Sequence, residues 1–171
     1  SRYAPADGLP ALEKAILRYT EENYGQMLAP QNVIVSSGAK QSIMNLLYAI
    51  LEPKDEVIYP APYWVSYPEM AKLAGGVGVA VVPEDGSFQP SVPDIADKVG
   101  SYTKAIILNS PNNPSGVMYS RDFVAEIVAF CEKKNLWLIM DDLYNRLVFD
   151  GQKAPNPYEF AGDTGEASRL V

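Results

Sequence analysis

Short apolar runs alternate with amphipathic segments along this chain, and that alternation restricts the possible folds more than any other feature. The runs lie at residues 32–37, 55–60, 77–83, 104–109 and 136–142. Their cores are continuously apolar, as is typical of strands that are covered on both faces. Strands that alternate with helices predict an α/β fold, built as a three-layer, doubly wound and mostly parallel sheet.

The intervening segments are predicted to be helices at residues 9–24, 38–52, 64–75, 91–100 and 120–135. In the first, apolar residues recur at a spacing that places them on one face. Ser91 and Ser120 are predicted N-caps, and Pro68 implies a kink or break in its helix. Residues 144–167 are predicted to be mostly loop, and residues 168–171 to begin a sixth strand.

Composition excludes several classes of function. The 171 residues include no histidine, which removes a Ser-His-Asp triad, a Cys-His pair and the commonest zinc ligand. A net charge of −7 argues against nucleic acid or an anionic membrane as a partner. No apolar run approaches the length of a transmembrane helix, and the N-terminal residues lack a signal-peptide pattern. The single cysteine, Cys131, excludes an intrachain disulfide and fits a reducing, cytoplasmic setting.

Polar and aromatic residues follow the predicted strands, where open parallel sheets bind their ligands. These segments are Ser36–Lys40, Ala61–Trp64, Asn109–Gly116 and Asp141–Tyr144. We expect them to gather on one rim of the sheet.

Each of these segments has two interpretations when it is taken alone. The start of the helix at Gly38 can bind a phosphate, or Gly38 can simply permit a tight turn. Trp64 can stack on a planar ring or fill the core. Asp141, at the end of an apolar strand, needs a partner, which can be an arginine, an amide or a protonated ring nitrogen. Asn113, held away from helical angles by Pro114, can present its side chain at the rim or form an ordinary turn.

The order and spacing of these groups are far more specific than any one of them. The sequence resembles the fold-type I pyridoxal-phosphate enzymes, and among them the class I aminotransferases of the aspartate aminotransferase group. The resemblance rests on YAPADGLPAL, SSGAKQSIMNLL, PAPYWVSYPEM, NSPNNPSG and DDLY, which together span almost the whole chain.

The resemblance implies a set of contacts with pyridoxal 5′-phosphate. The cofactor-binding residues that it implies are Gly38, Ala39 and Lys40 on the phosphate, Trp64 on the ring, Asn113 and Tyr144 on the 3-oxygen, Asp141 on the ring nitrogen, and Tyr3 on the phosphate of the other subunit of a homodimer. It also implies cis peptide bonds at Ala61–Pro62 and Asn113–Pro114. In this scheme, Asp141 points to the site and Asp142 to the opposite side of the strand.

The activity implied is transfer of an amino group between an amino acid and a 2-oxo acid, by a cytoplasmic enzyme. The family's Schiff-base lysine, its carboxylate-binding arginine and its small domain are expected beyond Val171. Residues 1–171 therefore resemble a partial large domain that cannot transaminate alone. The strand at 32–37 is expected to pair with a late strand from the same missing part.

Three other functions remain open from the sequence. The same cofactor serves lyases, synthases and decarboxylases, and some transcription regulators carry an aminotransferase-like domain that senses a ligand. A generic nucleotide-binding α/β domain is disfavoured, because no GxGxxG or GxxxxGK[ST] motif is present. The substrate also stays open among aspartate, aromatic and other amino acids.

Overall fold

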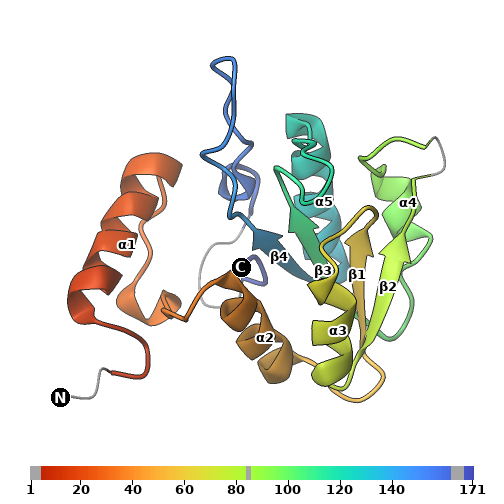
Figure 1. The fold of residues 1–171 in the computed structure, drawn as a ribbon, viewed down its shortest axis with the longest axis horizontal. Coiled ribbons are helices and arrows are strands. Elements are labelled where there is room, and N and C mark those ends of the chain that lie inside the picture. Colours follow the sequence, from red (N-terminus) through yellow and green to blue (C-terminus); the bar gives the residue numbers. More distant parts are fainter. Residues whose placement is uncertain (1–4, 84–85, 163–167) are drawn as a thin grey trace.

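From α2 (Ala39–Ile50) onward, helices and strands alternate in the order that the apolar runs predict (Figure 1). The computed structural model describes residues 5–83, 86–162 and 168–171. The helices are α1 (Pro10–Tyr24), α2 (Ala39–Ile50), α3 (Ser66–Leu73), α4 (Val92–Ala96) and α5 (Arg121–Lys134), with short 3-10 turns η1 (Pro30–Asn32) and η2 (Pro157–Glu159). The strands are β1 (Glu56–Pro60), β2 (Val77–Val81), β3 (Thr103–Asn109) and β4 (Trp137–Asp141). No helix in this described part is both long and apolar enough to cross a membrane.

The four strands form one parallel sheet in the order β2-β1-β3-β4. The register of β3 and β4 places Asn109 opposite Asp141 at the carboxyl edge. Beyond β4, Leu170 pairs in parallel with Leu138, and the N–H of Met140 donates to the carbonyl of Val171 at 2.7 Å. Residues 168–171, predicted to begin a sixth strand, form an isolated parallel bridge at Leu170 rather than a strand.

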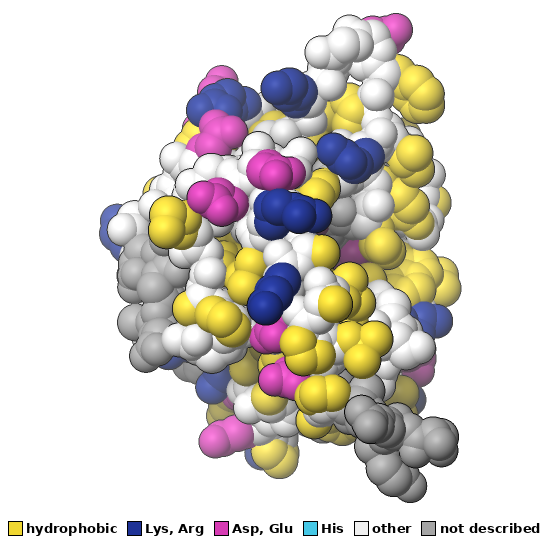
Figure 2. Space-filling model, turned by 90° about the vertical axis from the view of Figure 1, so that its left-hand side faces the viewer, with side chains coloured by type: hydrophobic (Ala, Val, Ile, Leu, Met, Phe, Trp, Pro, Cys, Tyr) yellow, Lys and Arg dark blue, Asp and Glu magenta, His cyan; other side chains and the backbone are white. Residues whose placement is uncertain are grey.

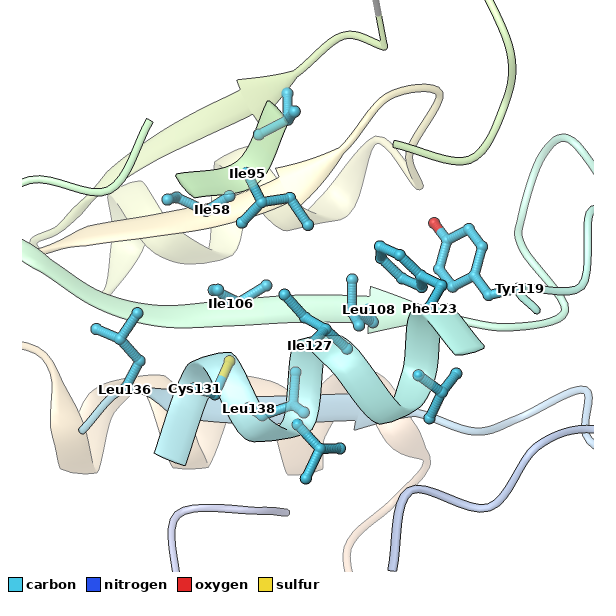
Figure 3. Close-up of a cluster of buried hydrophobic side chains, with 13 residues drawn as sticks. Ile58, Ile95, Ile106, Leu108, Tyr119, Phe123, Ile127, Cys131, Leu136 and Leu138 are labelled. Carbon is cyan, nitrogen blue, oxygen red and sulfur yellow. The ribbon is translucent and has the colours of Figure 1, made fainter. Parts of the chain in front are cut away.

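Two apolar clusters cover the two faces of the sheet and give the fold its three layers. On one face, Ile127 and Cys131 of α5 pack against Ile106 and Leu108 of β3, with Leu138 of β4 beside them (Figure 3). The other face is covered by α2 and α3, and its cluster includes Leu47, Met70, Val57, Ile107 and Ile139. Because successive strand residues face opposite clusters, each strand is apolar on both sides. The three-layer, doubly wound α/β fold is confirmed.

The predicted strand at residues 32–37 is wrong in the described structure. Residues 33–36 are neither helix nor strand. The N–H of Val35 donates to the carbonyl of Asp7 at 2.8 Å rather than to a strand of the sheet. An apolar segment becomes a strand only where a neighbouring backbone accepts its hydrogen bonds, and none of the four strands lies beside this one.

The predicted kink at Pro68 is also wrong. Helix α3 begins at Ser66, so Pro68 lies in its first turn, where the backbone N–H has no helical partner in any case. Both predicted serine caps are confirmed, because Ser91 Oγ accepts from Asp94 N and Ser120 Oγ accepts from Phe123 N. Helix α4 is shorter than the predicted range and ends at Ala96.

Helix α1 stands to the side of the layered body and joins it through its C-terminal end (Figure 1). There Tyr24 Oη donates to Asp142 Oδ2 at 2.8 Å, and the Arg146 guanidinium lies 5.2 Å from the centre of the Tyr19 ring. The N-terminal part of its predicted apolar face is exposed, with Leu9 at 57% and Leu12 at 44%. On this side of the molecule, basic and acidic side chains mingle with patches of hydrophobic ones (Figure 2).

Candidate functional site

The predicted site residues lie at the ends of neighbouring elements on the carboxyl edge of the sheet. Trp64 follows β1, Asn113 follows β3, Asp141 closes β4, and Gly38 precedes α2. This is the edge that parallel α/β sheets use for ligands. Tyr3 lies outside the described residues, so its predicted role stays a prediction.

The N-terminus of α2 offers backbone donors without a side-chain cap. Gly38 is the N-cap residue at φ 90° and ψ 160°, and it has no side chain that could accept a hydrogen bond from the first turn. The N–H of Ser37 is already used, because it donates to Gln41 Oε1 at 2.6 Å. Amides in the first turn of a helix have no carbonyl partner within that helix, so the N–H groups of Ala39 and Lys40 suit an anion.

Lys40 brings a positive charge close to the candidate aromatic residue. Its Nζ lies 4.8 Å from the centre of the Trp64 ring, which is a cation–π distance. Lys40 forms none of the ion pairs found among the described residues. This ammonium group is exposed, and it lies on the same edge of the sheet as the start of α2.

Tyr67 connects Trp64 to Asp141. Its ring lies 5.7 Å from the Trp64 ring at an interplanar angle of 89°. Its phenol Oη donates to Asp141 Oδ2 at 2.6 Å in a buried hydrogen bond. Tyr67 itself is 2% exposed. One buried side chain therefore contacts both the aromatic residue and the carboxylate of the candidate site.

The Asp141 carboxylate is buried and only partly satisfied. The residue is 6% exposed, and its Oδ1 has no hydrogen-bond partner in the described part of the chain. Burial raises the pKa of Asp141, while the hydrogen bond from Tyr67 opposes that shift. Burial and the neighbouring carboxylate also raise the pKa of Tyr67, so its phenol keeps its proton. Asp141 thus presents one free oxygen that would gain from a cationic N–H donor.

The turn after β3 places Asn113 on the same cleft as Tyr144. The turn is closed by its own hydrogen bonds, including Gly116 N to the carbonyl of Asn112 at 2.7 Å. Asn113 and Tyr144 line one cleft of 690 Å³. The peptide bonds at Ala61–Pro62 and Asn113–Pro114 are cis as expected, and Ser110–Pro111 is also cis, which the sequence did not suggest.

Asp142 has other hydrogen-bond partners than Asp141, in agreement with strand alternation. Its Oδ2 accepts from Tyr24 Oη at 2.8 Å and from Asn145 Nδ2 at 2.7 Å. The adjacent Asp141 contacts Tyr67 instead. The two carboxylates therefore serve different neighbours, and only Asp141 belongs to the candidate site.

Two buried residues of the site escaped the sequence analysis. Tyr67 lies one helical turn after Trp64, a spacing that brings side chains onto one face and that could have marked it. Asn109 ends β3, and its side chain donates to the carbonyl of Asp141 at 2.7 Å and accepts from Asn113 N at 2.6 Å. Asn109 could have been identified from its position at a buried strand end, because a buried polar side chain needs hydrogen-bond partners.

Comparison with known proteins identifies the family of the chain. The sequence profile of the family described as aminotransferase class I and II matches residues 1–167. A probable aspartate/prephenate aminotransferase of Thermus aquaticus is 40% identical over 153 residues, which cover 88% of this chain and 40% of that protein. An aspartate/prephenate aminotransferase of Cereibacter sphaeroides is 44% identical over 156 residues, covering 88% of this chain and 38% of that protein.

Solved structures show the same relationship. Aspartate aminotransferase from Thermus thermophilus with maleate superimposes with a TM-score of 0.89 at 36% identity, over 94% of this chain and 42% of that one. An aromatic aminotransferase from Pyrococcus horikoshii OT3 gives a TM-score of 0.90 at 31% identity, over 99% of this chain and 45% of that one. The chain thus spans about 40% of the length of the curated relatives it matches. This chain belongs to the class I and II aminotransferase family.

Proposed function

We propose that residues 1–171 are the cofactor-binding part of the large domain of a pyridoxal-phosphate-dependent aminotransferase. The observation that carries the proposal is the buried Oδ1 of Asp141, which has no partner among the described residues, while Oδ2 accepts from Tyr67, whose ring contacts Trp64. A carboxylate oxygen that is buried without a partner is costly unless a ligand supplies a donor. The protonated nitrogen of a pyridine ring is such a donor.

The described residues fit the other parts of the cofactor. The uncapped first turn of α2 offers the Ala39 and Lys40 amides to the phosphate, and Gly38 leaves open space where a Cβ would stand. Trp64 is half-buried at the same edge, as suits a side chain that stacks on the ring. Asn113 and Tyr144, on one cleft, would hold the 3-oxygen. We also propose that Tyr3 reaches the phosphate bound by the other subunit of a homodimer.

The residues of this chain would tune the reaction through charge. When bound, pyridoxal phosphate supplies an electron sink for the negative charge left on the α-carbon of an amino acid. Asp141 would hold the ring nitrogen protonated, because an adjacent negative charge favours a cation. Tyr67 would keep Asp141 ionised by its hydrogen bond, although burial pushes the pKa of that carboxyl upward. Asn113 and Tyr144 would donate to the 3-oxygen and stabilise its anionic form.

We further propose that the whole protein transfers an amino group from an acidic amino acid such as aspartate to a 2-oxo acid. Several relatives are named aspartate or aspartate/prephenate aminotransferases, and one solved relative is named with maleate, a dicarboxylate. Lys40 supports an acidic substrate, because its ammonium lies over Trp64 outside every described ion pair. Cys131 is free and buried, which is compatible with the cytoplasmic setting we propose.

The covalent lysine, the substrate arginine and the small domain are proposed to lie in the part of the protein beyond Val171. The fact that the chain spans about 40% of its relatives supports this division. Within residues 1–171, the functions assigned are cofactor binding and electronic tuning, not covalent attachment.

Reduction trapping tests the proposal on the full-length protein. The protein is incubated with pyridoxal phosphate, treated with sodium borohydride and mapped by peptide mass spectrometry. We expect one modified lysine, located beyond Val171, and transfer of an amino group from aspartate to a 2-oxo acid. A specific adduct on a lysine within residues 1–171 would contradict the proposal that the covalent lysine lies beyond Val171. A protein that binds no pyridoxal phosphate would contradict the proposed function itself.

The role of Lys40 has its own test. In Lys40→Ala, the KM for aspartate should rise much more than the KM for an aromatic amino acid, because only the acidic side chain loses a charge partner. Lys72→Ala, on the far part of α3, is the matched control. Equal changes for both classes of substrate in Lys40→Ala would argue against an acidic substrate.

A further inference from the structure

We propose that Asn109 is a positioning residue that fixes Asn113 relative to Asp141, and so matches the two ends of the cofactor ring to their partners. This inference rests on the proposed function, because Asn113 and Asp141 are the groups assigned to the 3-oxygen and to the ring nitrogen.

Asn109 occupies the point where the turn and the sheet meet. It is the last residue of β3, it lies opposite Asp141 in the register of β4, and it is 2% exposed. Its Nδ2 donates to the carbonyl of Asp141 at 2.7 Å. Its Oδ1 accepts from the N–H of Asn113 at 2.6 Å. The two ends of one amide thus hold the two segments that carry the assigned groups.

Within the described ranges, the backbone of the turn supplies no equivalent link to β4. Beyond Asn109 the chain passes through Ser110 to Pro111, which has no N–H to continue the ladder with β4. The hydrogen bonds that close the turn stay within it. They run from Asn112 N to the carbonyl of Val117 at 2.9 Å, and from Tyr119 N to Ser110 Oγ at 2.9 Å. They hold the shape of the turn, whereas Asn109 holds its place beside β4.

An amide is the side chain that this position requires. It carries an acceptor and a donor on one short, planar group, so it can bridge an N–H on one side and a carbonyl on the other. Aspartate at the same position keeps the acceptor for Asn113 but faces the carbonyl of Asp141 with a second oxygen. Leucine has a similar branched shape, although it is larger, and offers neither group. The two replacements therefore separate the two halves of the bridge.

Placement matters here because both assigned partners act on one rigid ring. A site must hold its groups to within about 0.5 Å of the productive geometry. If the turn shifts relative to β4, the ring can reach Asp141 with its nitrogen or Asn113 with its 3-oxygen, but it cannot reach both at the same time.

The experiment compares Asn109→Leu, Asn109→Asp and the parent in the full-length protein. The first measurement is residue-resolved amide hydrogen exchange of Asn113 without cofactor. We expect exchange to be about tenfold faster in Asn109→Leu and unchanged in Asn109→Asp, which retains the acceptor.

The second measurement is the pH midpoint of the visible absorbance of bound pyridoxal phosphate. We expect it to move to higher pH in both variants, because a weaker donor at the 3-oxygen or an added negative charge favours the protonated cofactor.

Ser110→Ala is the matched control, since it removes one buried hydrogen bond from the same turn without touching Asp141. It should leave the exchange of Asn113 and the pH midpoint unchanged. Unchanged exchange of Asn113 in Asn109→Leu, or an equal midpoint shift in Ser110→Ala, would overturn the role of Asn109. If Asn109→Leu does not fold, Asn109→Ala, which also removes both groups and adds no bulk, decides through the exchange of Asn113.

A protein that binds no pyridoxal phosphate would remove the proposed function, while the exchange experiment would still decide whether Asn109 holds Asn113 in place.

Discussion

The phenol of Tyr67 and the carboxylate of Asp141 meet in a buried hydrogen bond of 2.6 Å at the carboxyl edge of the sheet. It joins the first turn of α3 to the end of β4, which are separated by two strands and two helices in the sequence. Because it occupies Oδ2, while Oδ1 has no partner in the part of the chain that the structure describes, it also orients the carboxylate. The charge of the site therefore depends on a residue that would not itself touch a ligand.

Replacing Tyr67 with phenylalanine should destabilise the cofactor-free protein. The ring and its contact with Trp64 remain, but Oδ2 of the buried carboxylate loses its donor, so that neither oxygen has a partner among the described residues. A hydrogen bond to a charged group contributes roughly 1.5–3 kcal/mol, so we expect a loss of that order in the free energy of unfolding at neutral pH. Urea unfolding of the full-length protein measures it. Equal stability of variant and parent would show that the hydrogen bond contributes nothing.

The loss in the free energy of unfolding caused by Tyr67→Phe should depend on pH in a defined direction. Burial raises the pKa of Asp141 in the folded protein above its unfolded-state value. Between those two pKa values the folded state binds more protons, so the free energy of unfolding falls as the pH rises. Removing the Tyr67 donor raises the folded-state pKa further. The difference between variant and parent should therefore be largest at neutral pH and shrink as Asp141 becomes protonated in both proteins.

Tyr119→Phe should have the opposite effect on stability. Tyr119 is 1% exposed, and its hydroxyl has no partner among the described residues. Removing a buried, unpaired hydroxyl should stabilise the protein by about 1 kcal/mol. Burial raises the pKa of this phenol, so the gain should not change through the acidic and neutral range. The same urea titrations measure it, and a loss of stability would show that the hydroxyl has a partner in solution.

Asp141→Asn should separate stability from cofactor binding. The substitution removes a buried charge, and the new amide can still accept from Tyr67. We expect the cofactor-free protein to gain about 1 kcal/mol in the free energy of unfolding, while its affinity for pyridoxal phosphate falls. Thermal unfolding and fluorescence titration measure the two quantities. In the control Asp142→Asn, the contact with Tyr24 changes and the cofactor affinity should not. Equal losses of affinity in both variants would contradict the assignment of Asp141.

The layered fold could be predicted because its strands are continuously apolar and long enough to be recognised in the sequence. β1, β3 and β4 bury apolar residues on both faces, and this leaves a signature that does not depend on tertiary detail. The segment at 32–37 has the same signature but is not a strand here, since a strand also needs a neighbour. The apolar composition of a segment predicts that the segment is buried, but it does not predict which backbone lies beside it.

The candidate site was predictable to the extent that its residues follow strands. Trp64, Asn113 and Asp141 were expected on one rim, and the structure places them there. Tyr67 and Asn109 were not identified, because their importance lies in which atoms they meet across the sheet. A buried tyrosine in a helix and an asparagine at a strand end are ordinary until their partners are known.

Gly38→Ala should weaken binding of the cofactor through its phosphate. Gly38 adopts φ 90° and ψ 160°, a conformation that costs a non-glycine residue about 1–3 kcal/mol, although a Cβ would meet no atom there. Alanine should therefore shift the first turn of α2 and its free amides. We expect affinity for pyridoxal phosphate to fall much more than affinity for pyridoxal, which lacks the phosphate. Gly25→Ala, at another positive φ in open space at the end of α1, is the control and should change neither affinity. Equal losses for pyridoxal and pyridoxal phosphate in Gly38→Ala would place the phosphate elsewhere.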